Sequence, residues 1–318
     1  MALRLPDRWI WDSWYVKDGD TYHAFYLCAS RGLGDPNRRH RNPQIGHAIS
    51  KDLVNWEVLP DALTPSDEPA FDSWTTWTGS VIKDDSGKWW MFYTGSSREN
   101  GGLIQSVGAA VSEDLITWKK LSNKPLVEAD GNWYELLDLE VWGDQAWRDP
   151  WVFRFPNSSE YHMLVTARSK TGNPKTRGVV GHAVSSDLLN WKVMPPLSEP
   201  DQGFGQQEVF QFEIVDGVPI LLFCCGWREL DSKRVESLGK IDTTYSLAVD
   251  ANLTEVNFNK AQPFTEQIVY AGRLICGPDG KWNLIGFINE VDGKFVGELS
   301  DPIPVTADPI LGLIPRSR

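Results

Sequence analysis

Cysteine and histidine, the residues most used by redox centres and transition-metal sites, are scarce in this sequence. Its 318 residues include four cysteines and five histidines. Because the cysteines stand in apolar runs without metal-ligand spacing, we expect Cys28, Cys224, Cys225 and Cys276 to be buried free thiols. The histidines are scattered along the chain. The sequence therefore predicts no metal site and no cofactor.

Basic residues and long apolar runs are also in short supply. Lys and Arg number 31 against 43 for Asp and Glu, which gives a formal net charge of -12. This charge repels phosphate backbones and anionic lipids, so we expect neither a nucleic acid nor a membrane as a partner. No stretch approaches the roughly 20 apolar residues of a membrane span. Since Asp7 and Arg8 stand where a signal peptide needs its apolar segment, we expect a cytoplasmic protein, of open oligomeric state.

Aromatic residues, in contrast, are abundant, with 16 Trp, 13 Phe and 8 Tyr. Flat side chains fill the space between the sheets of all-β proteins. Aromatic rings also lie against the C–H faces of bound sugars. Composition alone does not separate these two explanations, so the positions along the chain must decide.

A repeated segment organises the chain. Gly46–Trp56 recurs as Gly108–Trp118 and as Gly181–Trp191, and each copy ends in the pattern Ser-x-Asp-Leu-x-x-Trp. Weaker echoes follow at Ser246–Asp250 and Gly297–Asp301. Before each copy, two apolar runs flank a turn such as Asp216-Gly217, which is typical of a β-hairpin.

Five such units of about 64 residues match four-stranded sheets stacked around an axis. A β-sandwich would give no reason for one pattern to return five times. The sequence therefore predicts an all-β, five-bladed β-propeller that occupies residues 1–318 as a single domain.

The innermost strands of a propeller line its central channel. Superposing the hairpins aligns the starts of the five first strands, which are Asp12, Gly79 or Ser80, Asp149, Glu208 and Gly272. Three are acidic, and carboxylates that converge in one channel raise each other's pKa. Glycoside hydrolysis needs one ionised and one protonated carboxyl group. Alternatively, each acidic residue caps a loop or pairs with an arginine, as Arg148 could with Asp149.

Several short motifs resemble those of two glycoside hydrolase families. Trp11-Asp12-Ser13-Trp14 looks like the opening motif of family 68, the levansucrases. Trp77-Thr78-Gly79-Ser80 is similar to a segment of both family 68 and family 32, the invertases. Arg148-Asp149-Pro150 matches their Arg-Asp-Pro motif, and Glu208 stands where their acid/base glutamate is expected. The resemblance spans most of the chain and is closest to family 68.

This resemblance implies a role for each matching residue. Asp12 would be the nucleophile, Glu208 the acid/base, and Asp149 the residue that stabilises the transition state. The implied substrate-binding residues are Trp11, Trp77, Ser80, Arg148 and Arg228. Family 32 enzymes usually carry a C-terminal β-sandwich, which we expect this chain to lack.

The leading hypothesis is a retaining glycosidase or transglycosidase that cleaves β-fructofuranosides such as sucrose through a covalent fructosyl-enzyme. Its partner would be a small carbohydrate. One alternative is an arabinofuranoside or xyloside hydrolase like those of families 43 and 62, and another is a non-catalytic sugar-binding propeller. The basic run Arg38–Arg41 is interpreted as a solvated loop, with the alternative that it overhangs the channel mouth.

Overall fold

The predicted strand–turn–strand units form antiparallel hairpins. In the fourth unit, Val215 pairs with Val218 across a two-residue turn, Asp216-Gly217. Both turn residues have positive φ, 49° and 87°, as a type I′ hairpin turn requires. Asp-Gly suits this turn because glycine reaches positive φ without steric cost and aspartate tolerates it.

A computed structural model describes residues 3–265 and 268–316, and these residues form five antiparallel sheets. Blade one contains β1 (Arg8–Asp18), β2 (Thr21–Ser30), β3 (Gln44–Ser50) and β4 (Trp56–Leu63). Blade two contains β5 (Thr75–Lys83), β6 (Trp89–Ser96), β7 (Gln105–Ser112) and β8 (Lys119–Lys120). Blade three contains β9 (Trp147–Arg154), β10 (Tyr161–Arg168), β11 (Gly178–Ser185) and β12 (Trp191–Met194).

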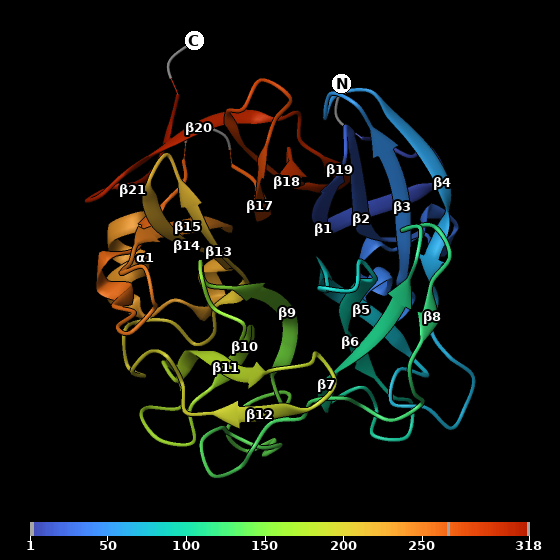
Figure 1. The fold of residues 1–318 in the computed structure, drawn as a ribbon. Coiled ribbons are helices and arrows are strands. Elements are labelled where there is room, and N and C mark those ends of the chain that lie inside the picture. The colour runs from blue at the N-terminus through green and yellow to red at the C-terminus, as the bar shows by residue number, and fades with distance from the viewer. Residues whose placement is uncertain (1–2, 266–267, 317–318) are drawn as a thin grey trace.

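The last two blades follow the same plan with additions. Blade four contains β13 (Glu208–Val215), β14 (Val218–Cys225), β15 (Thr243–Ala248) and β16 (Gln262–Pro263). Blade five contains β17 (Tyr270–Cys276), β18 (Trp282–Val291), β19 (Lys294–Leu299), β20 (Ile303–Asp308) and β21 (Gly312–Pro315). Figure 1 shows the sheets in chain order around a common centre, with β1, β5, β9, β13 and β17 innermost. The predicted five-bladed propeller is confirmed.

The repeated Ser-x-Asp-Leu-x-x-Trp segment is the turn between the third and fourth strands. In blade one, the Asp52 carboxylate accepts hydrogen bonds from the N–H groups of Val54 and Asn55, at 2.9 and 2.7 Å. Leu53 has a φ of 65° and a buried side chain. The same hydrogen bonds recur in blades two and three. One local structure thus explains the repeat.

In blades two and three, the tryptophan of this turn packs against the preceding blade. Trp118 of blade two meets Phe25 of blade one edge-on, with 5.6 Å between ring centroids. Trp191 of blade three meets Phe92 of blade two in the same way, at 5.5 Å. These two rings therefore pack between neighbouring sheets, which explains part of the high aromatic content.

Each innermost strand contains a β-bulge near its start. In blade three, for example, Asp149-Pro150 on β9 stands opposite the single residue Val165 on β10. Comparable register shifts interrupt β1, β5, β13 and β17. The first bulge residue has positive φ in three blades, namely Asp149 (59°), Val209 (57°) and Ala271 (48°). Bulges re-aim side chains and are common next to active sites.

Two predictions concern the cysteines and membranes. All four cysteines are free thiols, as predicted; Cys28, Cys224 and Cys225 are buried, whereas Cys276 is half-buried. In the described ranges, no helix is long and apolar enough to cross a membrane.

Candidate active site

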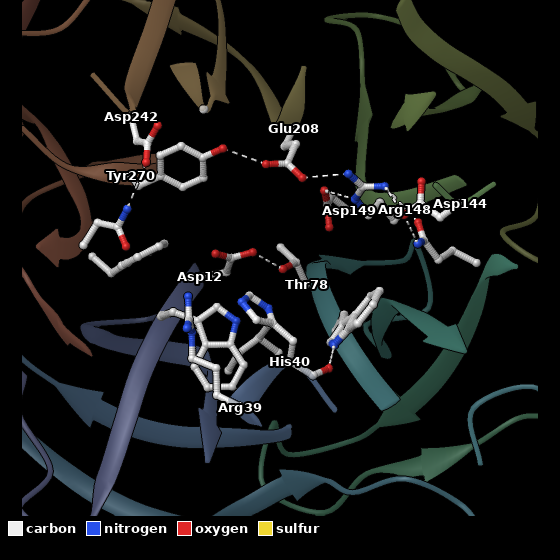
Figure 2. Close-up of a pocket in the computed structure, with 17 residues that line it drawn as sticks. Asp12, Arg39, His40, Thr78, Asp144, Arg148, Asp149, Glu208, Asp242 and Tyr270 are labelled. Atoms are coloured by element: carbon white, nitrogen blue, oxygen red, sulfur yellow. Dashed lines mark hydrogen bonds and ion pairs between the residues drawn. The ribbon is translucent and has the colours of Figure 1, made fainter. Parts of the chain in front are cut away.

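A well of about 320 Å³ opens where the first strands begin. Figure 2 shows three carboxylates facing it from different blades: Asp12 from β1, Asp149 from β9 and Glu208 from β13. The well is lined by Trp11, Asp12, Leu27, Arg39, His40, Trp77, Thr78, Gln105, Asp144, Arg148, Asp149, Glu208, Gly226, Asp242, Tyr270, Phe287 and Asn289.

The three carboxylates do not occupy equivalent strand positions, which corrects the sequence alignment. Glu208 is the last paired residue before its bulge, and its equivalents are Ile10, Arg148 and Tyr270. Asp149 is the first residue within a bulge, and Asp12 is the second. The carboxylates meet because the bulges turn successive positions towards the axis, not because the residues are in register.

Asp12 is half-buried on the side of the well nearest blade two. The Thr78 hydroxyl donates a hydrogen bond to its Oδ2. Burial raises the pKa of Asp12, and the nearby charge of Glu208 raises it further. The Thr78 hydrogen bond and the buried guanidinium of Arg273 act in the opposite direction because they favour the carboxylate.

Asp149 is buried beside Arg148, whose Nε lies 3.6 Å from Asp149 Oδ2. The Thr166 hydroxyl donates to the same oxygen at 2.9 Å. Burial raises the pKa of Asp149 to about 7, against the lowering effect of Arg148; the carboxylates of Glu208 and Asp12 add to the rise. A proton can therefore be held in this cluster near neutral pH.

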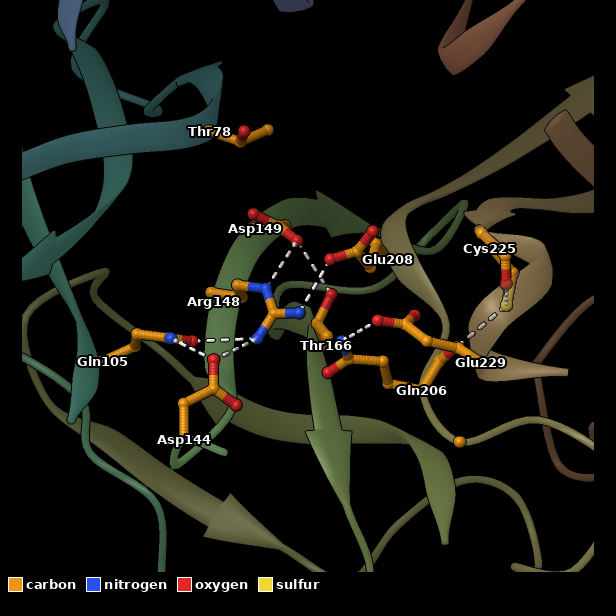
Figure 3. Close-up of polar contacts among 12 residues, drawn as sticks. Thr78, Gln105, Asp144, Arg148, Asp149, Thr166, Gln206, Glu208, Cys225 and Glu229 are labelled. Atoms are coloured by element: carbon orange, nitrogen blue, oxygen red, sulfur yellow. Dashed lines mark hydrogen bonds and ion pairs between the residues drawn. The ribbon is translucent and has the colours of Figure 1, made fainter. Parts of the chain in front are cut away.

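Glu208 is held at both carboxylate oxygens. Arg148 Nη2 donates to its Oε1, and the Tyr270 hydroxyl donates to its Oε2, each at 2.7 Å. Arg148 is in turn bound to Gln105 Oε1 at 2.9 Å. Burial disfavours the guanidinium charge, but the surrounding carboxylates outweigh this effect and raise the pKa of Arg148. Figure 3 shows Arg148 at the centre of this network.

Aromatic rings and a basic loop form the rim. The guanidinium of Arg39 lies 5.7 Å from the ring of Trp11, and the carbonyl of His40 accepts a hydrogen bond from Trp77 Nε1 at 2.9 Å. Both Arg39 and His40 line the well. The prediction that Arg38–Arg41 form a solvated loop is therefore wrong for Arg39 and His40. For these two residues the alternative holds, namely that the run overhangs the mouth of the channel. Burial lowers the pKa of His40 to about 4, so its ring is neutral at physiological pH.

Two predicted substrate-binding residues lie outside the well. Ser80 is fully buried, and its hydroxyl accepts a hydrogen bond from the N–H of Val152 at 3.0 Å, so it joins blades two and three. Arg228 is exposed and lies over the ring of Trp227, 4.5 Å from its centroid. The structure brings the other predicted residues together: Trp11, Asp12, Trp77, Arg148, Asp149 and Glu208.

The sequence analysis missed residues that lie beside the carboxylates. Thr78 and Tyr270 both donate to a carboxylate, yet neither is acidic, so the search for charge at strand starts passed over them. Thr78 stood within a motif that had been singled out. Asp242, in contrast, comes from the loop before β15 and lies outside the repeated segments.

The arrangement has the features of a carbohydrate hydrolysis site. Paired carboxyl groups of different proton affinity, in a partly closed well, can divide the roles of nucleophile and acid. Tryptophan rings at the rim offer flat apolar surfaces. Among residues 3–265 and 268–316, no group of three or more His, Cys, Asp or Glu residues could hold a metal ion.

Comparison with curated proteins finds plant enzymes of fructose chemistry. The chain is 36% identical to beta-fructofuranosidase 1 of Zea mays over 211 residues, which cover 65% of this chain and 29% of that protein. It is 27% identical to 6(G)-fructosyltransferase of Asparagus officinalis over 205 residues, covering 63% and 31%. The matched part thus spans about a third or less of the length of these relatives.

Comparison with solved structures agrees with the fold. The inulosucrase from Halalkalicoccus jeotgali bound to kestose superposes with a TM-score of 0.73 at 22% identity, covering 96% of this chain and 86% of that one. The family 32 beta-fructofuranosidase of Bombyx mori gives 0.72 at 22%, covering 96% and 62%. The levansucrase of Gluconacetobacter diazotrophicus gives 0.68 at 16%, covering 97% and 80%.

One family model matches nearly the whole propeller. Residues 12–296 match the model described as the glycosyl hydrolases family 32 N-terminal domain. The match begins at Asp12 and includes every carboxylate of the well. The chain therefore belongs to glycosyl hydrolase family 32.

Proposed function

We propose that this protein cleaves β-fructofuranosides, sucrose among them, by a retaining mechanism through a covalent fructosyl-enzyme. The observation that supports this most directly is the convergence of Asp12, Asp149 and Glu208 on one well, where Arg148 and Tyr270 hold Glu208. The names of the curated relatives, fructofuranosidase and fructosyltransferase, point to the same sugar.

Each carboxylate has a distinct part in the proposed reaction. A carboxylate oxygen of Asp12 attacks the anomeric carbon of the fructosyl unit, while Glu208 gives a proton to the leaving oxygen. The bond between the anomeric carbon and that oxygen breaks, and an ester to Asp12 forms. Glu208, now a carboxylate, takes a proton from water or a sugar hydroxyl, which attacks the anomeric carbon and releases Asp12.

Asp149 and its neighbours stabilise charge during these steps. The Asp149 carboxylate accepts hydrogen bonds from the hydroxyls of the fructosyl unit, and its negative charge favours the oxocarbenium-like transition state. Arg148 contacts both Asp149 and Glu208, so it fixes their relative positions. Trp11 and Trp77 wall the sugar at the rim.

Water as the acceptor of the fructosyl group gives hydrolysis, and a sugar hydroxyl as the acceptor gives transfer. The motif Trp11-Asp12-Ser13-Trp14 favours a closer relation to family 68, the levansucrases. The matching family model, however, is that of family 32. Both families use the same three carboxylates in the scheme above, so the proposed cleavage does not depend on which is closer.

The proposal is tested by incubating the protein with sucrose and measuring released fructose. We expect turnover, with Asp12→Asn and Glu208→Gln each reducing kcat by about a thousandfold or more, because each removes a group that forms or breaks bonds. NMR of the first product should show the β configuration. A folded protein that releases fructose from no fructoside would refute the proposal, and an inverted product would refute the covalent step.

The other two hypotheses predict different results. An arabinofuranoside or xyloside hydrolase would turn over the corresponding nitrophenyl glycosides with inversion, and the family match disfavours it. A non-catalytic sugar-binding propeller would bind its ligand equally well after Asp12→Asn and would show no turnover.

A further inference from the structure

Blade five contributes a buried arginine that the proposed reaction has not used. Arg273 is on the innermost strand β17, is 1% exposed, and does not line the well. It is the first paired residue after the bulge of β17. Its equivalents in blades one to four are Ser13, Gly79, Trp151 and Gln211. None of these four is charged, so Arg273 alone brings a charge to this position of the innermost strands.

The side chain of Arg273 contacts three other blades. Its Nη1 donates a hydrogen bond to the carbonyl of Phe210 on β13, and its Nη2 donates to the carbonyl of Gly79 on β5 at 3.5 Å. Its guanidinium lies 5.0 Å from the ring centroid of Trp151 on β9. Since a side chain of blade five reaches blades two, three and four, its guanidinium lies near the centre of the propeller, behind the wall of the well.

The direct partners of this guanidinium do not neutralise its charge. They are carbonyl oxygens, and within the described ranges its Nε is buried without a partner. A buried charge is costly unless opposite charge lies nearby. Burial lowers the pKa of Arg273 to about 10, and the charges of Asp149 and Asp12 oppose this effect. The guanidinium therefore stays charged at neutral pH and faces the carboxylates of the well.

Asp12 has less direct support from cations than the other two carboxylates of the well. Arg148 contacts Asp149 and Glu208. The hydrogen bond to the side chain of Asp12 comes from the neutral Thr78 hydroxyl. Burial and the charge of Glu208 raise the pKa of Asp12, whereas the charge of Arg273 lowers it. Because only the ionised carboxylate can attack, the charge of Arg273 bears directly on the proposed nucleophile.

The other titratable groups around Arg273 and Asp12 keep a constant charge in acid. They are Tyr15 on β1, Glu213 on β13, Cys224 on β14 and Arg39 at the rim. Burial raises the pKa of Tyr15 and that of Cys224, so both are neutral. Burial raises the pKa of Glu213 to about 7, so it is neutral at lower pH. Burial lowers the pKa of Arg39 to about 10, so it stays positive.

We propose that Arg273 is a positioning residue whose fixed positive charge, behind the wall of the well, keeps the nucleophile Asp12 ionised. This inference rests on the proposed function. The same charge favours the return of Asp12 to a carboxylate when the fructosyl-enzyme breaks down. Because its hydrogen bonds to two other blades hold the guanidinium in place, the charge needs no reorganisation during the reaction.

The test measures kcat/KM for sucrose against pH in variants with and without the charge. Arg273→Met and Arg273→Gln both remove it, and two such variants are made because one of them can fail to fold. We expect the acid limb of the profile, where activity rises as the nucleophile ionises, to move about one unit to higher pH. Below the limb, kcat/KM should therefore fall about tenfold. Arg273→Lys keeps the charge and should leave the limb close to its wild-type position.

Arg234→Met is the matched control. Arg234 also donates to backbone carbonyls, those of Gln202 and Phe258, and it lies 4.1 Å from the ring centroid of Phe204. It does not line the well. Its variant should lower Tm without moving the acid limb. An unmoved limb in a folded uncharged variant of Arg273 would overturn the inference. So would an equal movement in Arg273→Lys, because the shape of the side chain and not its charge would then be responsible.

A titration without turnover separates this inference from the proposed function. Aspartate labelled with ¹³C at the side-chain carboxyl is followed by NMR as the pH changes, and the resonance missing from Asp12→Asn identifies Asp12. In Arg273→Met or Arg273→Gln, Asp12 should titrate about one unit higher than in the wild type. That result supports the inference even if the wild type releases fructose from no fructoside. An unchanged titration in a folded variant overturns it, whatever the catalytic result.

Discussion

The hydrogen bond from Tyr270 to Glu208 offers a specific test of the acid/base assignment. Its oxygen–oxygen distance is 2.7 Å, and Tyr270→Phe removes only the hydroxyl group. Glu208 keeps its bond to Arg148 at Oε1. The variant therefore leaves the charge of the well unchanged but frees one oxygen of the acid/base.

The magnitude follows from the type of hydrogen bond. A bond to a charged group contributes about 1.5–3 kcal/mol, which corresponds to a factor of about 10–150 in rate if it is felt fully in the transition state. We expect kcat/KM for sucrose to fall within that range. A nitrophenyl β-fructofuranoside needs little protonation of its leaving group, so its kcat/KM should fall by no more than about threefold.

The control and the refuting result come from the same pair of substrates. Tyr245→Phe is matched, because this tyrosine is buried, does not line the well, and has a hydroxyl without a partner in the described part of the chain. It should affect neither substrate. Equal losses on both substrates in Tyr270→Phe would show that Tyr270 supports the structure of the well and not protonation by Glu208.

Three further predictions concern stability and pH. Ser80→Ala should lower the free energy of unfolding by about 1–3 kcal/mol, because the buried N–H of Val152 loses its acceptor; a raised KM for sucrose with unchanged stability would contradict its placement outside the well. Burial raises the pKa of Glu213 to about 7, so the folded protein loses stability as the pH rises through 7. Glu213→Gln should therefore raise Tm at pH 8 and not at pH 5, and an equal change at both would refute this. Thr166→Val removes a hydrogen bond that favours the Asp149 carboxylate, so the acid limb of the kcat/KM–pH profile should move to higher pH; an unmoved limb would contradict that role.

The fold could be predicted because its repeat has a local cause. The pattern Ser-x-Asp-Leu-x-x-Trp encodes one turn, in which the aspartate binds backbone N–H groups and the leucine is buried. Such a turn depends little on the rest of the molecule, so the same residues recur wherever it is needed. Its spacing then indicated how many sheets the chain forms, before any pairing between distant strands was known.

The loops around the well could not be predicted in this way. Arg39 and His40 belong to η2 (Pro36–Arg41), a turn whose start is marked by Asp35 and Pro36. Those residues predict a local turn but do not say which surface it covers. That depends on contacts with Trp11 and on the bond from the distant Trp77, which only the assembled propeller brings together.

The bulges explain how the right carboxylates emerged from an alignment that was wrong in register. A strand without a bulge points alternate side chains to opposite faces, so Asp149, which directly follows the position equivalent to Glu208, would have faced away from the axis. One extra residue per first strand breaks this alternation, and the next two positions become available to the well. Asp149 occupies the first of these positions and Asp12 the second, while Arg148 and Tyr270 occupy the position of Glu208 and bind it. Because the hairpin repeat fixes a strand start only to within about two residues, it predicts which blades contribute carboxylates but not how those groups are paired.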